Sequence, residues 1–443
     1  MAAQDAERLV PLEEVQHLAL SRARALPPVE IALDDALGCV LAHDAVATED
    51  VPPFANTAMD GYAVRASDTA NAPVELRVVD VLGAGSSPNV GVGPGEAVQI
   101  MTGAPIPPGA DAIAIVERAE AVLIGGSAKP GPGSLVRILD SVVPGAHFRA
   151  AGSDLAAGSV AVAAGTVLEP AHIGVLASIG AGLVKVHPRP RVGVMSTGDE
   201  LVELAADGSA RPLSPGQIRD SNRHALLATL RRDGCVPVDL GLAIDTEEAV
   251  TAGLERALAT CDAVITTGGV SKGEFDYVKT VLAKMGAATG EVRELSVAIR
   301  PAKPLVLGWL GNRDGAEPRL VPVFGLPGNP VSSLVSYEAI ALPVLRVLAG
   351  HAPAAPPTVP ALADPGLRRR ADGKTHLVRV ELSWRADGRL AARAAGGQMS
   401  HQLSGMAVAN GLAVVPDGEG IAEGEMLEVI PFGPIGPFGA RGT

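Results

Sequence analysis

Apolar residues recur at helical spacing near the start of the chain, and the pattern becomes strand-like soon afterwards. From Leu12 to Ala19 they follow the helix period behind Pro11, which predicts a helix over 12–25. Between about residues 46 and 150, short Val- and Ile-rich runs alternate with turns rich in Gly and Pro. This texture is typical of a small β-rich domain, with strands expected at 76–81 and 112–116.

Strand-like and helix-like segments then alternate from about residue 189 to 350, after a stretch of strand and helix over 151–188. This alternation predicts a parallel, doubly wound α/β sheet. The expected strands are 191–195, 236–240, 263–267 and 320–324. The expected helices are 221–232, 245–259, 276–285 and 331–348, of which the second is capped from Asp245 and the third ends at Gly286.

The C-terminal part of the chain returns to a β pattern. A linker rich in Pro and Ala is expected over 351–366. Beyond it, residues 376–384 alternate as a strand does, and Asp387 and Gly388 supply a hairpin turn. A small β domain therefore closes the chain.

Composition narrows the class of protein. Apolar residues make up 47% of the 443 residues, and the formal net charge is −13. A basic face for nucleic acid is not expected, and an anionic membrane surface would repel the chain. Three cysteines without a CxxC pair indicate a reducing compartment, the N-terminus does not resemble a signal peptide, and no charge-free stretch predicts a membrane span. We therefore expect a soluble, cytoplasmic protein.

Three loops rich in Gly and Pro each follow an expected strand: Ser196–Glu200, Thr266–Asp276 and Gly325–Ser332. In a parallel sheet such loops gather at the carboxyl edge, where ligands bind. Glycines there let backbone amides approach an anion, and helix N-termini favour phosphate. The alternative for any one loop is a plain tight turn.

Carboxylates cluster in the first two loops, at Asp199, Glu200, Glu274 and Asp276. They would repel a phosphate unless a divalent cation lay between them. Mg²⁺ commonly binds one or two carboxylates together with phosphate oxygens, so a magnesium site is expected here. For Asp276, capping of the following helix is an equal alternative.

Positive charge for an oxyanion comes from Lys272, Arg300 and Lys303, of which the last two lie in a rigid Arg-Pro-Ala-Lys-Pro segment. The alternative is that each is a solvated surface charge. No P-loop and no GxGxxG after a strand is present. One rival motif is Gly269–Gly273, which fits GxSxG around Ser271 and would suit a serine hydrolase.

Five ordered motifs, spread over most of residues 10–435, resemble the molybdenum insertase family, which includes the E domain of gephyrin. Residues 56–65, Asn-Thr-Ala-Met-Asp-Gly-Tyr-Ala-Val-Arg, are similar to the SAMDGYA signature of that family. The other motifs are 100–105, 196–201, 267–277 and 326–332.

The resemblance implies a multidomain α/β plus β fold with a doubly wound α/β domain of the molybdopterin-binding type. Its implied domains are a discontinuous one from 1–45 and 151–188, a β-rich insert 46–150, the α/β domain 189–350 and a small C-terminal β domain 351–436. It also implies a homodimer, with an active cleft between the α/β domain of one subunit and the β insert of the other.

The implied activity is Mg²⁺-dependent insertion of molybdate into adenylyl-molybdopterin, which releases AMP and forms the molybdenum cofactor. The implied catalytic residues are Asp60, Thr102, Glu200, Asp245, Asp276 and Arg300, with Glu200 and Asp276 on the metal. The implied substrate-binding residues are Arg149, Asp154, Gly268, Gly269, Ser271, Lys303, Pro327, Gly328, Asn329, Pro330, Arg379 and Ser400. The chain departs from the family where Arg300 replaces a usual Lys and Ser296 replaces a basic residue.

Two further classes remain open from the sequence. One is a molybdopterin adenylyltransferase, since that family shares the α/β domain, although its small members lack the insert and the C-terminal domain. The other is a scaffold protein with a vestigial site, against which the intact Asp60, Glu200 and Asp276 argue. Other proteins of the cofactor pathway are candidate partners.

Overall fold

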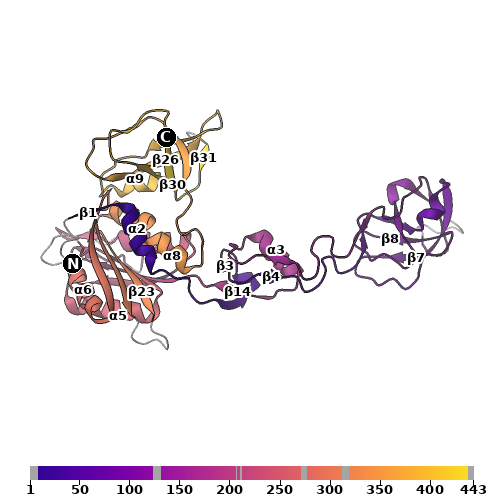
Figure 1. Cartoon of the computed structure of the whole chain (residues 1–443), viewed down its shortest axis with the longest axis horizontal. Coiled ribbons are helices and arrows are strands. Elements are labelled where there is room, and N and C mark those ends of the chain that lie inside the picture. The colour runs from indigo at the N-terminus through magenta and orange to yellow at the C-terminus, as the bar shows by residue number, and fades with distance from the viewer. Residues whose placement is uncertain are drawn as a thin grey trace. The chain divides into compact units, whose positions relative to one another are not determined.

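The computed structural model describes residues 8–122, 131–205, 207–209, 212–270, 277–311 and 319–437. They form two compact units (Figure 1). The first unit comprises Met1–Glu30, Gly38–Ala42 and Lys185–Thr443, and the second comprises Ile31–Leu37 and His43–Val184. The four-domain division remains a prediction, but α2 (Leu12–Ser21) packs against α8 (Leu342–Leu348) within the first unit.

A seven-stranded sheet forms the centre of the first unit, in the order β1-β20-β22-β23-β19-β15-β18. The four expected strands are present as β15 (Arg191–Thr197), β18 (Val236–Ala243), β19 (Ala263–Thr267) and β23 (Leu320–Leu326). These four are parallel to one another, which confirms the expected arrangement. Three strands were not foreseen: β1 (Leu9–Val10), β20 (Gly290–Val297) and β22 (Pro304–Gly311), of which β20 and β22 form an antiparallel pair.

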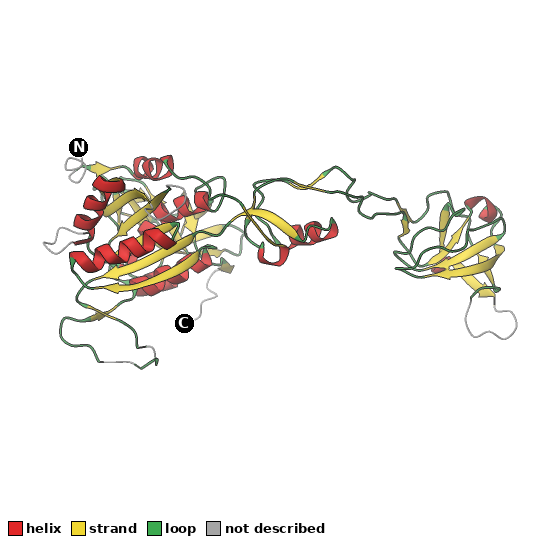
Figure 2. Ribbon diagram, turned by 90° about the horizontal axis from the view of Figure 1, so that it is seen from below, coloured by secondary structure: helices red, strands yellow, loops and turns green. Residues whose placement is uncertain are grey.

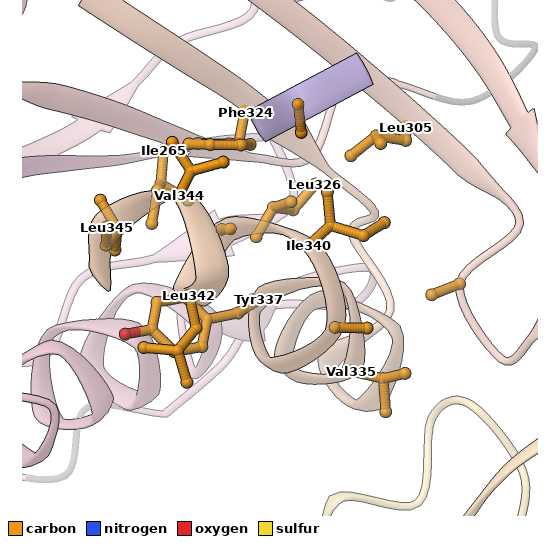
Figure 3. Close-up of a cluster of buried hydrophobic side chains, with 14 of the residues drawn as sticks. Ile265, Leu305, Phe324, Leu326, Val335, Tyr337, Ile340, Leu342, Val344 and Leu345 are labelled. Carbon is orange, nitrogen blue, oxygen red and sulfur yellow. The ribbon is translucent and has the colours of Figure 1, made fainter. Parts of the chain in front are cut away.

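Helices cover both faces of this sheet, as a doubly wound fold requires (Figure 2). Alternate residues of each strand supply the two cores, as when Ile265 faces one core and Val264 the other. The first core is packed by α2, α4 (Asn222–Arg232), α7 (Pro330–Ser336) and α8, and Figure 3 shows its side chains around Phe324 and Ile340. The second is packed by α5 (Glu247–Thr260) and α6 (Tyr277–Thr289).

Three element boundaries differ from expectation. Helix α2 ends at Ser21 instead of residue 25, because the chain turns away and the Leu26 amide donates to the Leu348 carbonyl. The cap of α5 is the Thr246 side chain, which accepts from the Ala249 amide, and is not Asp245. Helix α6 runs through Gly286 to Thr289, because this glycine serves close packing: a Cβ there would lie 2.8 Å from Cγ2 of Val292.

A small β domain follows at the C-terminus, as expected. Its strands β26, β27, β24, β30 and β28 pair in a closed ring around an apolar core. The hairpin at Asp387–Gly388 joins β26 (Thr375–Trp384) to β27 (Leu390–Ala394), with Gly388 at φ 78°. The expected linker is partly wrong, since its Pro- and Ala-rich stretch ends in β24 (Val359–Ala363). The other strands are β21 (Ile299–Arg300), β25 (Leu367–Arg368), β28 (Gly411–Val415), β29 (Gly420–Ile421), β30 (Met426–Pro431) and β31 (Gly436–Pro437), with the short helix α9 (Leu403–Val408).

The second unit is built mainly from a six-stranded sheet in the order β10-β11-β7-β8-β6-β9. Both marked strands are confirmed, as β7 (Val74–Leu82) and β9 (Ala112–Ile115). The remaining strands of the sheet are β6 (Gly61–Val64), β8 (Glu96–Ile100), β10 (Ala119–Val122) and β11 (Leu135–Ile138). Residues 151–184 contribute β13 (Val160–Val162) and α3 (Pro170–Ser178), which confirms strand and helix in that stretch.

Two features bear on the expected cellular setting. Cys39, Cys235 and Cys261 are free and buried, as structural thiols are. Among the described helices, the run Pro330–Leu348 is long and apolar enough to cross a membrane, but 83% of it is buried inside the first unit. It is therefore placed as a core helix.

A π-helical turn (Tyr337–Ala341) joins α7 to α8 and carries a buried carboxylate. Glu338 is 2% exposed and accepts from Nη2 of Arg232 on α4 at 2.6 Å. The Nη1 of the same arginine donates to the Phe432 carbonyl at 3.0 Å, so one guanidinium joins two helical layers to the C-terminal domain. Burial raises the pKa of Glu338 to about 7 from the usual 4.5, although Arg232 opposes this and Asp233 adds to it.

Replacing Glu338 by Gln should therefore change how stability depends on pH. A raised pKa in the folded state means that the contribution is present below about pH 4.5 and is lost as the pH rises through about 7. The wild-type protein should lose up to roughly 3 kcal/mol relative to the variant over this window. Denaturant unfolding of both proteins at matched pH values measures the difference, and parallel curves would contradict the assignment.

Candidate functional site

The ends of three parallel strands lie side by side at one edge of the α/β sheet. Ser196 at the end of β15 pairs with Thr267 at the end of β19, and Thr267 pairs with Leu326 at the end of β23. The loops that begin at Gly198, Gly268 and Pro327 therefore leave the sheet from the same edge. The register brings together three loops whose starts are about 60 to 70 residues apart in the sequence.

Glycine is required where the second loop crosses the first. Gly268 has φ 94°, and a Cβ there would lie 2.4 Å from the Thr197 carbonyl oxygen. Its amide donates to the Leu326 carbonyl at 3.2 Å, and its Cα lies 3.7 Å from the position of a Cβ on Gly328. Gly269, at φ 63°, is equally confined, by Val278. The loops are thus packed backbone against backbone, which leaves a surface formed largely of main chain.

A side chain that the sequence reasoning missed ties two of these loops together. Nδ2 of Asn222 donates to Oγ1 of Thr267 and to the Gly328 carbonyl, both at 2.8 Å. Oγ1 of Thr267 donates in turn to the Pro327 carbonyl at 3.2 Å. The only signal in the sequence is a run of polar residues, Asp-Ser-Asn, just before α4.

Asp220, two residues earlier, anchors the same segment to the first strand. Its carboxylate accepts from Oγ of Ser196 at 3.0 Å and from Nε of Arg223 at 2.9 Å. Both Asp220 and Arg223 are 2% exposed, and Arg223 also contacts Asp239 and Glu203 at the surface. The start of α4 therefore fixes all three strand ends.

Carboxylates flank the first loop, where a magnesium site is expected. The Asp199 amide donates to Oδ2 of Asp245 at 3.3 Å, and the Asp245 amide donates to Oδ1 of Asp199 at 3.1 Å. Glu200 is exposed beside this pair. Asp276 and Ser271 lie outside the described residues, within which no three His, Cys, Asp or Glu side chains converge as a complete metal site. Exposed carboxylates beside a phosphate-sized main-chain surface suit Mg²⁺, which keeps waters and shares substrate oxygens.

The cationic segment also reaches this edge. Strand β22 is antiparallel to β23, with Val306 opposite Gly325, so the turn that carries Lys303 lies by the end of β23. Arg300 continues into the C-terminal domain, where it pairs with His376 of β26. Ser296 is buried in β20 opposite Pro304, and so a residue of the sheet stands where the family usually has a basic one.

The C-terminal domain contributes a buried arginine next to the third loop. The Ser400 carbonyl accepts from the Val331 amide at 3.1 Å, at the start of α7. Arg379 is fully buried, and its Nη2 donates to the carbonyls of Gly397 and Met399. Its Nε and Nη1 have no hydrogen-bond partner among the described residues. Buried donors without an acceptor are costly, and an anion would satisfy them.

The second unit carries a separate group of predicted residues. The backbone amide and Oγ1 of Thr102 both donate to Oδ1 of Asp60, at 2.6 and 2.7 Å. These two bonds lower the pKa of the Asp60 carboxyl, so it is ionised at neutral pH. Arg149 pairs with Asn56 in the two-stranded sheet of β12 (Phe148–Arg149) and β5 (Asn56–Thr57), and the Asp154 amide donates to the Val51 carbonyl at 3.0 Å.

A doubly wound α/β domain with an anion-binding carboxyl edge, combined with a β-rich unit and a closed C-terminal β domain, defines the class of protein. Three family descriptions cover most of the chain. They are the MoeA N-terminal region (domain I and II) at residues 10–180, the probable molybdopterin binding domain at 193–347, and the MoeA C-terminal region (domain IV) at 368–432.

Individual relatives agree. "Molybdopterin molybdenumtransferase 2" of Mycobacterium tuberculosis is 36% identical over 94% of this chain and 98% of its own length. "Molybdopterin molybdenumtransferase" of Nostoc sp. is 36% identical over 86% and 83%. A solved molybdopterin biosynthesis MoeA protein from Pyrococcus horikoshii is 30% identical, with a TM-score of 0.75 over 96% of this chain and 100% of its own. The chain belongs to the MoeA family of molybdopterin molybdenumtransferases.

Alanine at position 268 should disrupt the edge more than alanine at an unconfined glycine. Gly234 is the matched control, since it also has positive φ (76°) but no atom within 4 Å of the position that a Cβ would take. We expect Gly234→Ala to cost about 1 kcal/mol from backbone strain, and Gly268→Ala at least about 1 kcal/mol more from overlap with Thr197. Denaturant unfolding compares them, and equal costs would contradict the close approach.

Replacing Asn222 by Ala should loosen the second and third loops. Two hydrogen bonds of about 1 kcal/mol each are removed, so amide exchange at residues 266–270 and 327–331 should quicken by roughly tenfold or more. Ser221→Ala is the control, because Ser221 makes no side-chain cap of α4. Hydrogen–deuterium exchange with mass spectrometry provides the readout, and unchanged exchange in the Asn222 variant would remove its positioning role.

Proposed function

We propose that this protein inserts molybdate into adenylyl-molybdopterin in an Mg²⁺-dependent reaction that releases AMP and forms the molybdenum cofactor. The observation that carries the proposal is the convergence of glycine loops, carboxylates and cations at one sheet edge, in a chain of the molybdopterin molybdenumtransferase family. The protein works in the cytoplasm in this proposal, as a homodimer.

The glycine loops bind the phosphates of the adenylylated substrate. Close packing at Gly268 and Gly328 presents main chain to the ligand, and α7 begins at Pro330 directly after the third loop. A phosphate there gains from amide donors and from the helix N-terminus without the clash that side chains would cause. Asn222 acts as a positioning residue, because it holds two of these loops and its own side chain is not required to contact substrate.

Glu200 and Asp276 are the proposed ligands of Mg²⁺, with Asp245 next to Glu200 through its contacts with Asp199. When bound, the ion neutralises phosphate charge and acts as a Lewis acid. The carboxylates hold it in reach of the phosphates, and the exchange between Asp199 and Asp245 keeps the first loop in place.

Arg300 and Lys303 hold the molybdate in this proposal, close to the dithiolene that replaces its oxo groups. Arg300 retains positive charge where the family usually has Lys, and its forked guanidinium can make two parallel hydrogen bonds to an oxyanion. The two partnerless donors of Arg379 support an anion near Ser400. These contacts compensate for the absence of a basic side chain at Ser296.

Asp60 and Thr102 complete the site from a second copy of the chain. The support is the family resemblance, together with a carboxylate that Thr102 keeps ionised and exposed. Arg149 and Asp154, on the same unit, are assigned to substrate binding on the same basis.

Two alternatives find less support. An adenylyltransferase of the same α/β type would not require the N- and C-terminal regions, yet residues 10–180 and 368–432 match both. A serine hydrolase would depend on Ser271, which lies outside the described residues, and His376, one of its candidate bases, contacts Asp372.

A reconstituted assay with adenylyl-molybdopterin, molybdate and Mg²⁺ tests the proposal. The wild-type protein should form cofactor and release AMP, whereas Asp60→Ala and Glu200→Gln should each lose at least about a hundredfold in rate, as expected when a group that acts on the reacting centre is removed. Asp80→Asn, an exposed carboxylate elsewhere in the second unit, is the control.

Mixing the Asp60→Ala and Glu200→Gln variants tests the shared site. Heterodimers that contain both should regain about a quarter to a half of the wild-type rate, because one of their two sites carries both native residues. AMP release without molybdate would instead indicate adenylyl chemistry alone. No recovery on mixing, with dimers formed, would place both residues in one subunit's site.

A further inference from the structure

A basic cavity of about 520 Å³ opens where the C-terminal domain meets β21. Its lining includes Arg300, Arg368, Arg370, Asp372 and His376. Lys374 reaches the same carboxylate, with Nζ at 3.5 Å from Oδ2 of Asp372. This local excess of positive charge occurs in a chain whose formal net charge is −13, so ordinary surface composition does not account for it.

Arg369, which also lines the cavity, serves the architecture. It is 5% exposed, and its Nη1 donates to the carbonyls of Lys374 and Pro416 at 2.7 and 3.0 Å. Its Nη2 donates to Oδ1 of Asp372 at 2.6 Å and to Oδ1 of Asp417 at 2.8 Å. Its hydrogen-bonding groups are occupied by the protein, so binding of a ligand falls to the other cations.

One carboxylate oxygen occupies the centre of those other cations. Oδ2 of Asp372 lies 3.2 Å from Nε2 of His376 and 3.8 Å from Nη1 of Arg300. Burial lowers the pKa of His376, and the neighbouring Asp372 opposes this shift, so the imidazole adds little positive charge at neutral pH. Arg300 itself is 61% exposed, and its pairing with Asp372 is long enough to be exchanged for a better acceptor.

We propose that this cavity binds a tetrahedral oxyanion, and that Asp372 is an internal anion that competes with it for Arg300 and Lys374. The proposal rests on the proposed function, which supplies two anions of this chemistry: molybdate and the phosphate of the adenylylated substrate. Asp372 sets affinity and does not take part in bond changes.

The physical consequence is a weak and readily reversible site. A bound dianion gains the attraction of several cations, but it must displace a carboxylate that is already among them. Repulsion by Asp372 then shortens the residence time of the anion, which suits a substrate that has to leave for the reaction. Neutralising Asp372 removes both the competitor and the repulsion.

Titration calorimetry with sodium molybdate, and separately with AMP, measures the effect on the full-length protein. Asp372→Asn keeps the Oδ1 acceptor for Arg369 and should tighten oxyanion binding by about threefold to tenfold at low salt. Asp372→Glu retains the charge and should stay close to wild type, whereas Arg300→Ala should weaken binding. Asp364→Asn is the matched control: its side chain is 24% exposed, against 25% for Asp372, and it pairs with Arg385 instead of facing the cavity.

The outcomes separate the possibilities. Tightening for molybdate only, or for AMP only, supports the proposal and identifies the anion. Unchanged or weaker binding by Asp372→Asn, with unfolding midpoints equal to wild type, overturns it even if cofactor synthesis proceeds normally. Lower thermal stability of Asp372→Asn with wild-type affinity in Asp372→Glu and Asp372→Asn alike shows a purely structural residue and also overturns it. Loss of cofactor synthesis by the wild-type protein would contradict the proposed function and leave the affinity comparison standing.

Discussion

The parallel register of β15, β19 and β23 is the constraint on which the rest of the site depends. It places Ser196, Thr267 and Leu326 in one row, and the crossing of Gly268 over the Thr197 carbonyl then leaves no room for a side chain. A shift of one residue in any of the three strands would turn its buried face outward and separate the loops. Binding of anions at this edge is therefore a consequence of the same hydrophobic alternation that forms the two cores.

Electrostatics divides the first unit into two kinds of surface. The loop after β15 gathers Asp199, Glu200 and Asp245, while the segment of Arg300 and Lys303 continues toward a basic cavity. An acidic side can hold a divalent cation and a basic side can hold an oxyanion, so a reaction that needs both can use the ground between them. Arg379 adds buried donors next to the third loop, at a desolvation cost that only an anion offsets well.

The sequence predicted the parts of this arrangement that follow from local pattern. The four parallel strands, their helices and the hairpin at Gly388 have clear periodicity or turn residues, and the structure confirms them. Strand β20 was missed because Glu291, Arg293 and Glu294 give it the charge of a loop, although β22 covers it. The staple at Asn222 joins residues 45 and 106 positions away, so no local pattern could reveal it. The metal ligands and the partner subunit came from family resemblance alone, since no spacing in the chain specifies them.

The most direct test of the central claim is a crystal structure of the protein with AMP, Mg²⁺ and molybdate. The account predicts that the AMP phosphate lies within hydrogen-bonding distance of the loops that begin at Gly268 and Pro327, with the metal between it and Glu200. A nucleotide bound elsewhere on the first unit, with those loops left empty, would contradict it.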